Sequence, residues 1–265
     1  MLDEWLAARR VVCVAHRGGA KLRPENTVSA FDHAIESKVD GIELDVRLSR
    51  DGQPVVIHDA TLDRTTNLRG PVEALTVAEL SHVDAAHRFD PDRGFPYRGR
   101  GIGIARLADV VDRYRGVPLV VEIKGESREL AERTVAVIHD AGAAGRVVIG
   151  GFNPVTMGAA RAAGPDLITS AATPEVRWAL YRSWVGLAPR RPPYRLFQVP
   201  ERKDWHRVVS RRFVSAARRS LVPVHVWTVN DPADMRRLIR WGVTGLITDR
   251  PDVALELVLT ESRTG

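Results

Sequence analysis

Two short apolar runs of the sequence each carry a pair of ionisable residues spaced two apart. In "GIELDV" the pair is Glu43 and Asp45, and in "VVEIKG" it is Glu122 and Lys124. Side chains two apart on a strand point to the same face, so each pair is expected to project together. A carboxylate in an apolar strand is costly unless it is paired, hydrogen-bonded or bound to a metal. The sequence therefore predicts that Glu43, Asp45 and Glu122 bind a hard divalent cation, Mg²⁺ or Ca²⁺.

Cationic residues are expected beside these acids. Arg17 follows the apolar run "VVCVA", and Lys124 is one of only four lysines in a chain whose other basic residues are all arginine. A lysine ammonium can hold a phosphate as a point charge, and an arginine can hold it with two hydrogen bonds. The alternative interpretation is a structural salt-bridge network in which Arg17 and Lys124 only neutralise the acids.

Two histidines stand at the ends of apolar runs in the same part of the sequence. His16 directly precedes Arg17, and His58 ends "PVVIH". Each imidazole titrates near neutral pH, so a pair on opposite sides of a metal suits general acid–base catalysis. His225 lies within another apolar run and is expected to be structural.

Apolar runs alternate with helical patterns through most of the 265 residues, which is typical of βαβ units. Eight such units in a chain of this length predict a (β/α)₈ TIM barrel, an α/β fold whose chemistry lies at the carboxyl ends of the strands. Strands are expected at 11–16, 40–46, 117–123, 146–151, 167–172, 195–199, 222–228 and 245–249. Helices are expected at 27–38, 105–115, 128–142, 154–163, 174–185, 206–220, 232–241 and 252–261.

One stretch after the second expected strand breaks this alternation. Asp51-Gly52 is a tight-turn signal between two extended runs. A parallel crossover needs a dozen or more residues, so residues 55–57 are expected to fold back as an antiparallel hairpin. The hairpin opens a mostly irregular insertion, 46–104, within a single domain that spans 1–265. A long segment at this place is expected to cover the active site.

Composition narrows the partners and the compartment. The net charge of +6 and the pI near 10.0 would suit nucleic acid, but no nucleic-acid-binding fingerprint accompanies them, so none is expected. Cys13 is the only cysteine, which excludes an internal disulfide framework. The sequence shows neither a signal peptide nor an apolar run long enough to cross a membrane, and a cytoplasmic location is expected. Nothing in it sets the oligomeric state.

Several of these stretches resemble the glycerophosphodiester phosphodiesterases: "HRGGAKLRPENTVSAF", "DGIELDVRLSRDGQPVVIHDATLDRTT", "VEIKG", "HVWTVND" and "GVTGLITDRPD". The resemblance runs from about residue 11 to 255. It implies a TIM barrel with a small insertion after the second strand, and metal-dependent hydrolysis of glycerophosphodiesters to glycerol 3-phosphate and an alcohol. It leaves open whether water or the glycerol 2-hydroxyl is the nucleophile, and which histidine is the acid. At matching positions it implies catalytic His16 and His58, metal ligands Glu43, Asp45 and Glu122, phosphate contacts from Arg17 and Lys124, pocket residues Gln198 and Trp227, and supporting residues Glu25 and Asn26.

Three other functions stay open at this stage. The stretch "WALYRSWVGLAPRRPPYRLF", residues 178–197, has the composition of a membrane-contacting surface, so the substrate could be a lysophospholipid; the same stretch also fits an ordinary helix with packed aromatic residues. A catalytically idle barrel that binds an anionic partner is favoured only by the pI. A glycosidase that uses two of the three carboxylates would leave both histidines unexplained.

Overall fold

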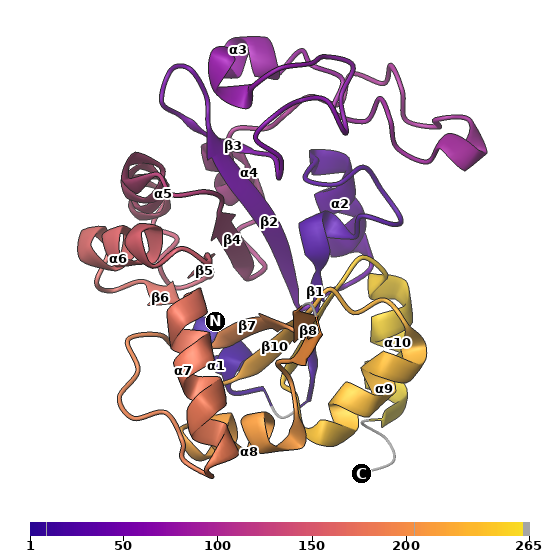
Figure 1. Ribbon diagram of the computed structural model, residues 1–265. Coiled ribbons are helices and arrows are strands. Elements are labelled where there is room, and N and C mark those ends of the chain that lie inside the picture. The colour runs from indigo at the N-terminus through magenta and orange to yellow at the C-terminus, as the bar shows by residue number, and fades with distance from the viewer. Residues whose placement is uncertain (9, 204, 262–265) are drawn as a thin grey trace.

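The computed structural model describes residues 1–8, 10–203 and 205–261 (Figure 1). Eight parallel strands follow one another in the order β6-β5-β4-β2-β1-β11-β10-β7, and a parallel bridge between Ser170 and Leu196 joins the two outer strands. This arrangement confirms the predicted (β/α)₈ fold. The strands are β1 (Val12–Ala15), β2 (Gly41–Leu48), β4 (Leu119–Ile123), β5 (Val147–Gly150), β6 (Ile168–Thr169), β7 (Phe197–Pro200), β10 (Val224–Trp227) and β11 (Gly245–Thr248).

Helices surround the strands, and local signals fix several of their ends. The side chain of Thr27 accepts a hydrogen bond from the amide of Ala30, and Gly242 ends its helix in the left-handed conformation at φ 86°. None of the helices in the described part of the chain is long and apolar enough to cross a membrane. The helices are α1 (Leu2–Leu6), α2 (Val28–Glu36), α3 (Val77–Leu80), α4 (Leu107–Arg113), α5 (Arg128–Asp140), α6 (Pro154–Ala163), α7 (Thr173–Trp184), α8 (Arg211–Arg219), α9 (Pro232–Trp241) and α10 (Pro251–Glu261).

The helix predicted to start at residue 206 starts later. Residues 206–207 instead form β9 (His206–Arg207), which pairs antiparallel with β8 (Arg202–Lys203). The helix α8 begins only after Ser210, whose hydroxyl accepts a hydrogen bond from the amide of Phe213. A serine capable of capping outweighed the apolar pattern before it.

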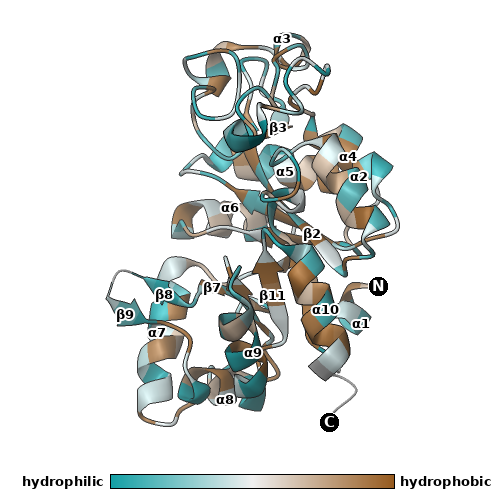
Figure 2. Cartoon of the chain, turned by 90° about the vertical axis from the view of Figure 1, so that its right-hand side faces the viewer, coloured by the Kyte–Doolittle hydropathy of each residue, from teal (hydrophilic) through white to brown (hydrophobic). Residues whose placement is uncertain are grey.

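Alternation along the strands separates the core into two layers. Ile42, Leu44 and Leu119 point outward and pack against the helices in the main hydrophobic cluster. Val14 and Val120 point into the barrel, where they belong to a smaller cluster. Figure 2 shows that hydrophobic residues concentrate on the central strands and on α10. The inward-facing residues nearer the amino-terminal ends of the strands are therefore mostly apolar. Polar inward-facing residues occur nearer the carboxyl ends, as with Glu122, two residues after Val120.

The short helix α1 closes the amino-terminal end of the barrel. Leu2 and Trp5 are buried and join the interior cluster. The ring of Trp5 meets the ring of His225 edge-on, with centroids 4.9 Å apart. His225 is 1% exposed, and burial lowers its pKa to about 3. It is a neutral core residue, as predicted.

The segment after β2 folds back over the barrel. β3 (Pro54–Val56) pairs antiparallel with β2, which confirms the predicted hairpin. The following residues form α3, two short 3₁₀ helices (Val72–Ala74 and Pro91–Arg93) and loops, seen at the top of Figure 1. They have a small hydrophobic core of their own, with Leu62, Val72, Leu80, Val83 and Ile104 among its members.

Candidate active site

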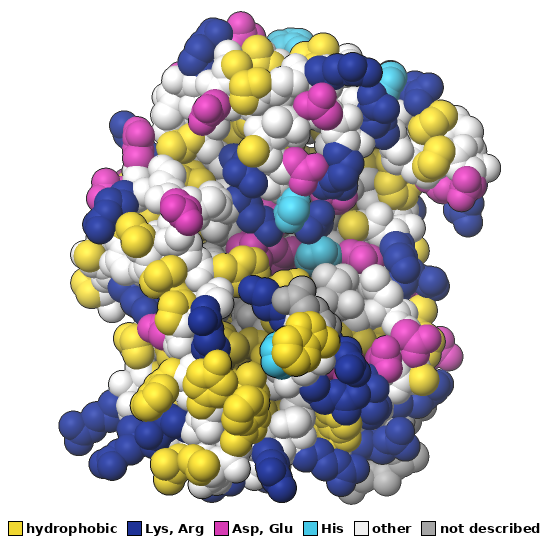
Figure 3. Space-filling model, viewed as in Figure 1, with side chains coloured by type: hydrophobic (Ala, Val, Ile, Leu, Met, Phe, Trp, Pro, Cys, Tyr) yellow, Lys and Arg dark blue, Asp and Glu magenta, His cyan; other side chains and the backbone are white. Residues whose placement is uncertain are grey.

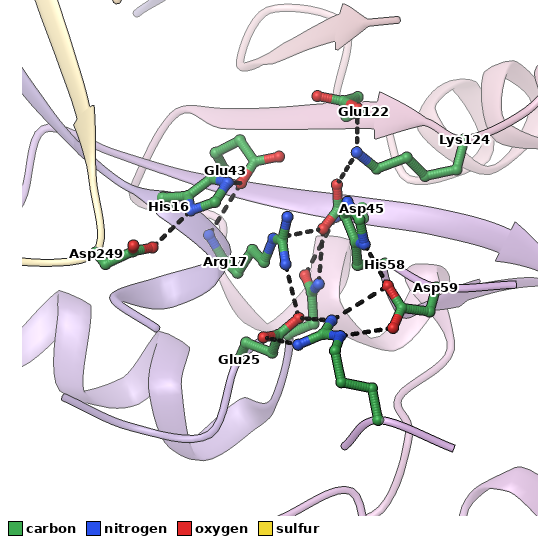
Figure 4. A network of polar contacts seen from close by, with 12 residues as sticks. His16, Arg17, Glu25, Glu43, Asp45, His58, Asp59, Glu122, Lys124 and Asp249 are labelled. Carbon is green, nitrogen blue, oxygen red and sulfur yellow. Dashed lines mark hydrogen bonds and ion pairs between the residues drawn. The ribbon is translucent and has the colours of Figure 1, made fainter. Parts of the chain in front are cut away.

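Three carboxylates meet where the middle of β2 lies beside the carboxyl end of β4 (Figure 4). Glu43 and Asp45 come from β2 and Glu122 from β4, and the register places Asp45 opposite Glu122. One oxygen atom from each carboxylate lies within 4.8 Å of the others. Glu43 is 4% and Asp45 is 1% exposed, so water screens their repulsion poorly. The spacing of two in each strand brought these side chains together as predicted.

Two cations accompany the acids but do not balance them. Nζ of Lys124 lies 2.9 Å from Oδ1 of Asp45 and forms a shorter ion pair with Glu122. Nε of Arg17 lies 3.1 Å from Oδ2 of Asp45. Glu43 accepts a 2.9 Å hydrogen bond from the backbone amide of Arg17 but has no lysine or arginine side chain beside it among the described residues. A salt-bridge network exists, and it leaves Glu43 without a full positive charge.

The pKa values of the acids reflect this imbalance. Burial, together with the charges of Asp45 and Glu122, raises the pKa of Glu43 to about 8. Burial also raises the pKa of Glu122. Burial alone would raise the pKa of Asp45, but Lys124 and Arg17 outweigh it and hold that pKa below its ordinary value. Glu43 is therefore the carboxylate that most requires a further positive charge.

His16 is held by a residue from the far end of the chain. Its Nδ1 lies 2.6 Å from Oδ1 of Asp249, and its Nε2 lies 3.9 Å from Oε2 of Glu43. Oδ2 of Asp249 accepts a 2.8 Å hydrogen bond from the side-chain amide of Asn230. Burial alone would lower the pKa of His16, but Glu43 and Asp249 outweigh it, so that this pKa is raised. The ring is oriented from behind, with Nε2 directed toward the acids.

His58 is held by a separate network. Its Nδ1 lies 2.5 Å from Oδ1 of Asp59, whose other oxygen accepts a 2.6 Å hydrogen bond from Nε of Arg64. Arg64 also donates two hydrogen bonds to Glu25, which in turn accepts one from Arg17 at 2.8 Å. Burial lowers the pKa of His58, and nearby carboxylates only partly oppose this. The network links the covering segment to the loop after β1.

Asn26 supports Asp45 from the same loop. Its amide nitrogen donates to Oδ2 of Asp45 at 2.8 Å, and its carbonyl oxygen accepts the backbone amide of Asp45 at 3.2 Å. Asn26 has a positive φ of 58°, a conformation that asparagine tolerates better than most residues. This contact and that of Glu25 with Arg17 fit the supporting part predicted for "PENT".

A cavity of about 150 Å³ opens above these groups. Gln198 and Trp227 both line it, Gln198 from within β7 and Trp227 from the end of β10. The Trp227 ring packs on Phe152, with ring centroids 5.4 Å apart. The lining consists of His16, Arg17, Glu43, His58, Glu122, Lys124, Phe152, Gln198, Trp227, Thr228 and Ile247. Every predicted catalytic, metal-binding and substrate-binding residue except Asp45 lines this cavity, and Asp45 lies among the lining acids and cations.

The sequence reasoning missed four residues of the site. Phe152 directly follows one expected barrel strand and Asp249 is the last residue of another, so their position at the carboxyl end of a strand was an available signal. Asp59 follows His58 directly. Nothing in the sequence distinguishes Arg64 from the other arginines of the covering segment.

Comparison with known proteins identifies the family. Residues 16–253 match the model of the Glycerophosphoryl diester phosphodiesterase family. The chain belongs to this family. The predicted family and the prediction of an enzyme of this kind are both confirmed.

Relatives in this family extend over nearly the whole chain. A glycerophosphodiester phosphodiesterase of Caldanaerobacter subterraneus subsp. tengcongensis is 32% identical, and the match covers 94% of this chain and 98% of that one. The crystal structure of a glycerophosphodiester phosphodiesterase from Agrobacterium tumefaciens is 27% identical, with a TM-score of 0.74, covering 92% of this chain and 98% of that one.

A more distant structure shares the fold. A phosphodiesterase from Oleispira antarctica, solved in complex with the product sn-glycerol-3-phosphate, is 23% identical with a TM-score of 0.77. The match covers 96% of this chain and 98% of that one.

Proposed function

We propose that this chain is a metal-dependent hydrolase of glycerophosphodiesters that releases glycerol 3-phosphate and an alcohol. The observation that carries the proposal is the convergence of Glu43, Asp45 and Glu122 within 4.8 Å, beside two histidines and two cations. Relatives named glycerophosphodiester phosphodiesterases support the substrate class, as does the product in the Oleispira antarctica structure.

The three carboxylates fit a hard divalent cation. Metal–oxygen distances of about 2.0–2.6 Å for Mg²⁺ and Ca²⁺ allow one ion to contact oxygens up to roughly 5 Å apart. The raised pKa of Glu43 is a reason to expect a positive charge at this place, because a cation would stabilise the ionised carboxylate. The metal would be held by Glu43, Asp45 and Glu122. A bound Mg²⁺ or Ca²⁺ polarises phosphoryl oxygens and lowers the pKa of a coordinated hydroxyl.

The protein's own cations would bind and orient the phosphodiester. Arg17 and Lys124 line the cavity next to the carboxylates and present N–H donors to an anion. They would neutralise charge that develops on the phosphoryl oxygens. Gln198 and Trp227 would contact the organic part of the substrate from the opposite wall.

His16 and His58 would move the protons. His16 directly follows β1 and His58 belongs to the covering segment, so the two rings approach the cavity from different parts of the chain. One would take a proton from the nucleophile and the other would give a proton to the leaving alcohol. Asp249 and Asp59 each hold one ring nitrogen, which leaves the opposite nitrogen for this task.

The decisive experiment combines a product assay with metal removal. The purified chain should release glycerol 3-phosphate from glycerophosphocholine, lose this activity in EDTA, and recover it when Mg²⁺ or Ca²⁺ is added. Glu43→Gln, which keeps the side-chain volume, should show weaker metal binding by calorimetry and an unchanged melting temperature. Full turnover by a preparation shown by elemental analysis to be metal-free would contradict the proposal.

The exposed aromatic residues of α7 favour a second candidate substrate. Trp178 is 64% and Trp184 is 57% exposed. Such side chains suit an enzyme that meets an acyl chain, so the same chemistry on lysophospholipids, a lysophospholipase D activity, is the alternative. A series of lysophosphatidylcholines of increasing chain length separates the two, because only a lipid enzyme should turn over the longer members faster than glycerophosphocholine. The single domain and the cytoplasmic location stay predictions.

A further inference from the structure

The positive charge of this protein is concentrated in one part of the chain. Residues 176–230 contain twelve lysines and arginines but only two acidic residues, a net charge of +10 against +6 for the whole sequence. The rest of the chain therefore carries a net negative charge. Two nearby carboxylates neutralise arginines outside residues 176–230. Glu175, just before this part, pairs with Arg161, and Glu201, within it, pairs with Arg237. Among the described residues, Arg195 pairs with Asp3, and the other lysines and arginines of residues 176–230 form no ion pair, so most of this charge can meet an anionic partner.

The same part of the chain exposes large apolar side chains. On α7, Ala179, Leu180 and Ser183 face the core, while Trp178, Tyr181 and Trp184 point outward. Val185 and Leu187, just beyond the helix, are 71% and 49% exposed. We call the group Trp178, Tyr181, Trp184, Val185 and Leu187 the α7 surface. A group of exposed apolar side chains of this kind often marks an interaction site, whereas single exposed apolar residues are ordinary on protein surfaces.

Cations interleave with the α7 surface. The guanidinium of Arg182 lies 6.0 Å from the centroid of the Trp178 ring. Arg177, Arg190 and Arg191 are exposed, and no carboxylate of the described residues lies within ion-pair distance of them. Aromatic side chains beside arginines without a carboxylate partner are typical of protein surfaces that bind the headgroup layer of an anionic membrane.

The α7 surface lies beside the active site. Figure 3 shows hydrophobic and basic side chains over α7 on the same face as the central hollow, where acidic and histidine side chains gather. Strand β8 also lies on this face (Figure 1), and Trp205, in the β8–β9 connection, is 81% exposed. An object that covers α7 would therefore also lie close to the mouth of the barrel.

We propose that the α7 surface docks on an anionic phospholipid bilayer and so brings the mouth of the barrel to the lipid. A second copy of the chain suits the surface poorly, because a two-fold contact would set its arginines against one another. A nucleic acid would contact the arginines through its phosphates, but it would leave the exposed apolar side chains of Val185 and Leu187 without a partner. The proposal concerns binding and holds whichever diester the enzyme hydrolyses.

The experiment measures sedimentation of the full chain with phospholipid vesicles. Vesicles of equal parts phosphatidylcholine and phosphatidylglycerol should bind the chain, vesicles of phosphatidylcholine alone should not, and added salt should weaken the binding. Arg190→Gln/Arg191→Gln should bind about 30-fold more weakly, the equivalent of roughly 2 kcal/mol for two basic residues near the bilayer. The matched control, Arg69→Gln/Arg128→Gln, removes two exposed arginines elsewhere and should bind like the wild type.

A second pair of variants tests the apolar part. Trp178→Ala/Trp184→Ala should lose most of its binding at high salt, whereas Leu68→Ala/Leu259→Ala, which also removes exposed apolar side chains, should not. All four double variants should hydrolyse glycerophosphocholine as the wild type does. A failure of the proposed reaction would appear in that assay, and a failure of docking in the sedimentation.

Three results would overturn the proposal. The first is equal binding to both kinds of vesicle, or the same loss in the control variants. The second is preference for a DNA duplex over anionic vesicles, with Trp178→Ala/Trp184→Ala unaffected. The third is a dimer in sedimentation equilibrium that these two tryptophan substitutions abolish.

Discussion

Nδ1 of His16 lies 2.6 Å from Oδ1 of Asp249, although 233 positions separate the two residues in the sequence. The pairing of β1 with β11 explains this proximity. Their register places Ala15 opposite Thr248, so the residue after each strand end meets its counterpart at the mouth of the barrel. The carboxylate fixes the imidazole from behind and leaves Nε2 to face the cavity.

Asp249 is expected to position His16. Asp249→Asn keeps the shape but removes the charge and the fixed acceptor for Nδ1–H, so kcat should fall by roughly 10²-fold or more. Steady-state kinetics on glycerophosphocholine should show little change in KM, and calorimetry should show unchanged metal binding. The control Asp252→Asn, which alters an acid whose ion pair among the described residues is with Arg250, should retain full activity. A near-normal kcat for Asp249→Asn would remove this residue from the mechanism.

The two histidines should divide the acid and base roles. His16→Ala and His58→Ala should each lose roughly 10²- to 10⁴-fold in kcat, the usual scale of general acid–base catalysis. A nitrophenyl diester has a good leaving group and needs little acid assistance, so it should rescue only the variant that lacks the acid. His139→Ala, which removes an exposed histidine paired with Asp166, serves as the control. Equal rescue of both variants would contradict the division.

His225 should make the fold sensitive to acid. Its pKa is near 3 in the folded protein against 6.5 for an ordinary histidine, so below pH 6.5 the unfolded state takes up a proton that the folded state refuses. The free energy of unfolding should therefore fall by about 1.4 kcal/mol for each pH unit between about 6.5 and 3. Urea denaturation at pH 7 and pH 5 should show a smaller pH dependence for His225→Leu than for the wild type. Identical slopes would show that His225 is charged or solvated in the folded state.

Gly245 is expected to be essential for the packing of the barrel interior. A Cβ at this position would lie 2.5 Å from Cδ2 of the buried His225 ring, so Gly245→Ala forces strands or ring to shift. Overpacking of this kind typically costs 1–3 kcal/mol, and we expect a loss of about 2 kcal/mol in thermal or urea denaturation. Gly116→Ala, whose Cβ would meet nothing within 4 Å, should be close to neutral. Equal stability of both variants would mean that the interior gives way at little cost.

The sequence by itself determined which side chains share a face. Glu43 with Asp45, and Glu122 with Lys124, are spaced two apart, and the period of a strand leaves no other outcome once the strands form. The turn at Asp51-Gly52 likewise indicated the antiparallel hairpin, because so short a connection cannot form a parallel crossover. Local geometry within about ten residues is sufficient for these predictions.

Only the tertiary structure decided which distant residues touch these side chains. Asp249 reaches His16 because the last barrel strand closes beside the first, and Arg64 reaches Glu25 because the covering segment folds back over the loop after β1. The start of α8 also depended on its surroundings, since the β8–β9 hairpin replaced its first predicted turn. Such contacts depend on how the strands close into a barrel and how the loops pack, and both depend on the whole chain. Spacing in the sequence fixes only the relative direction of neighbouring side chains.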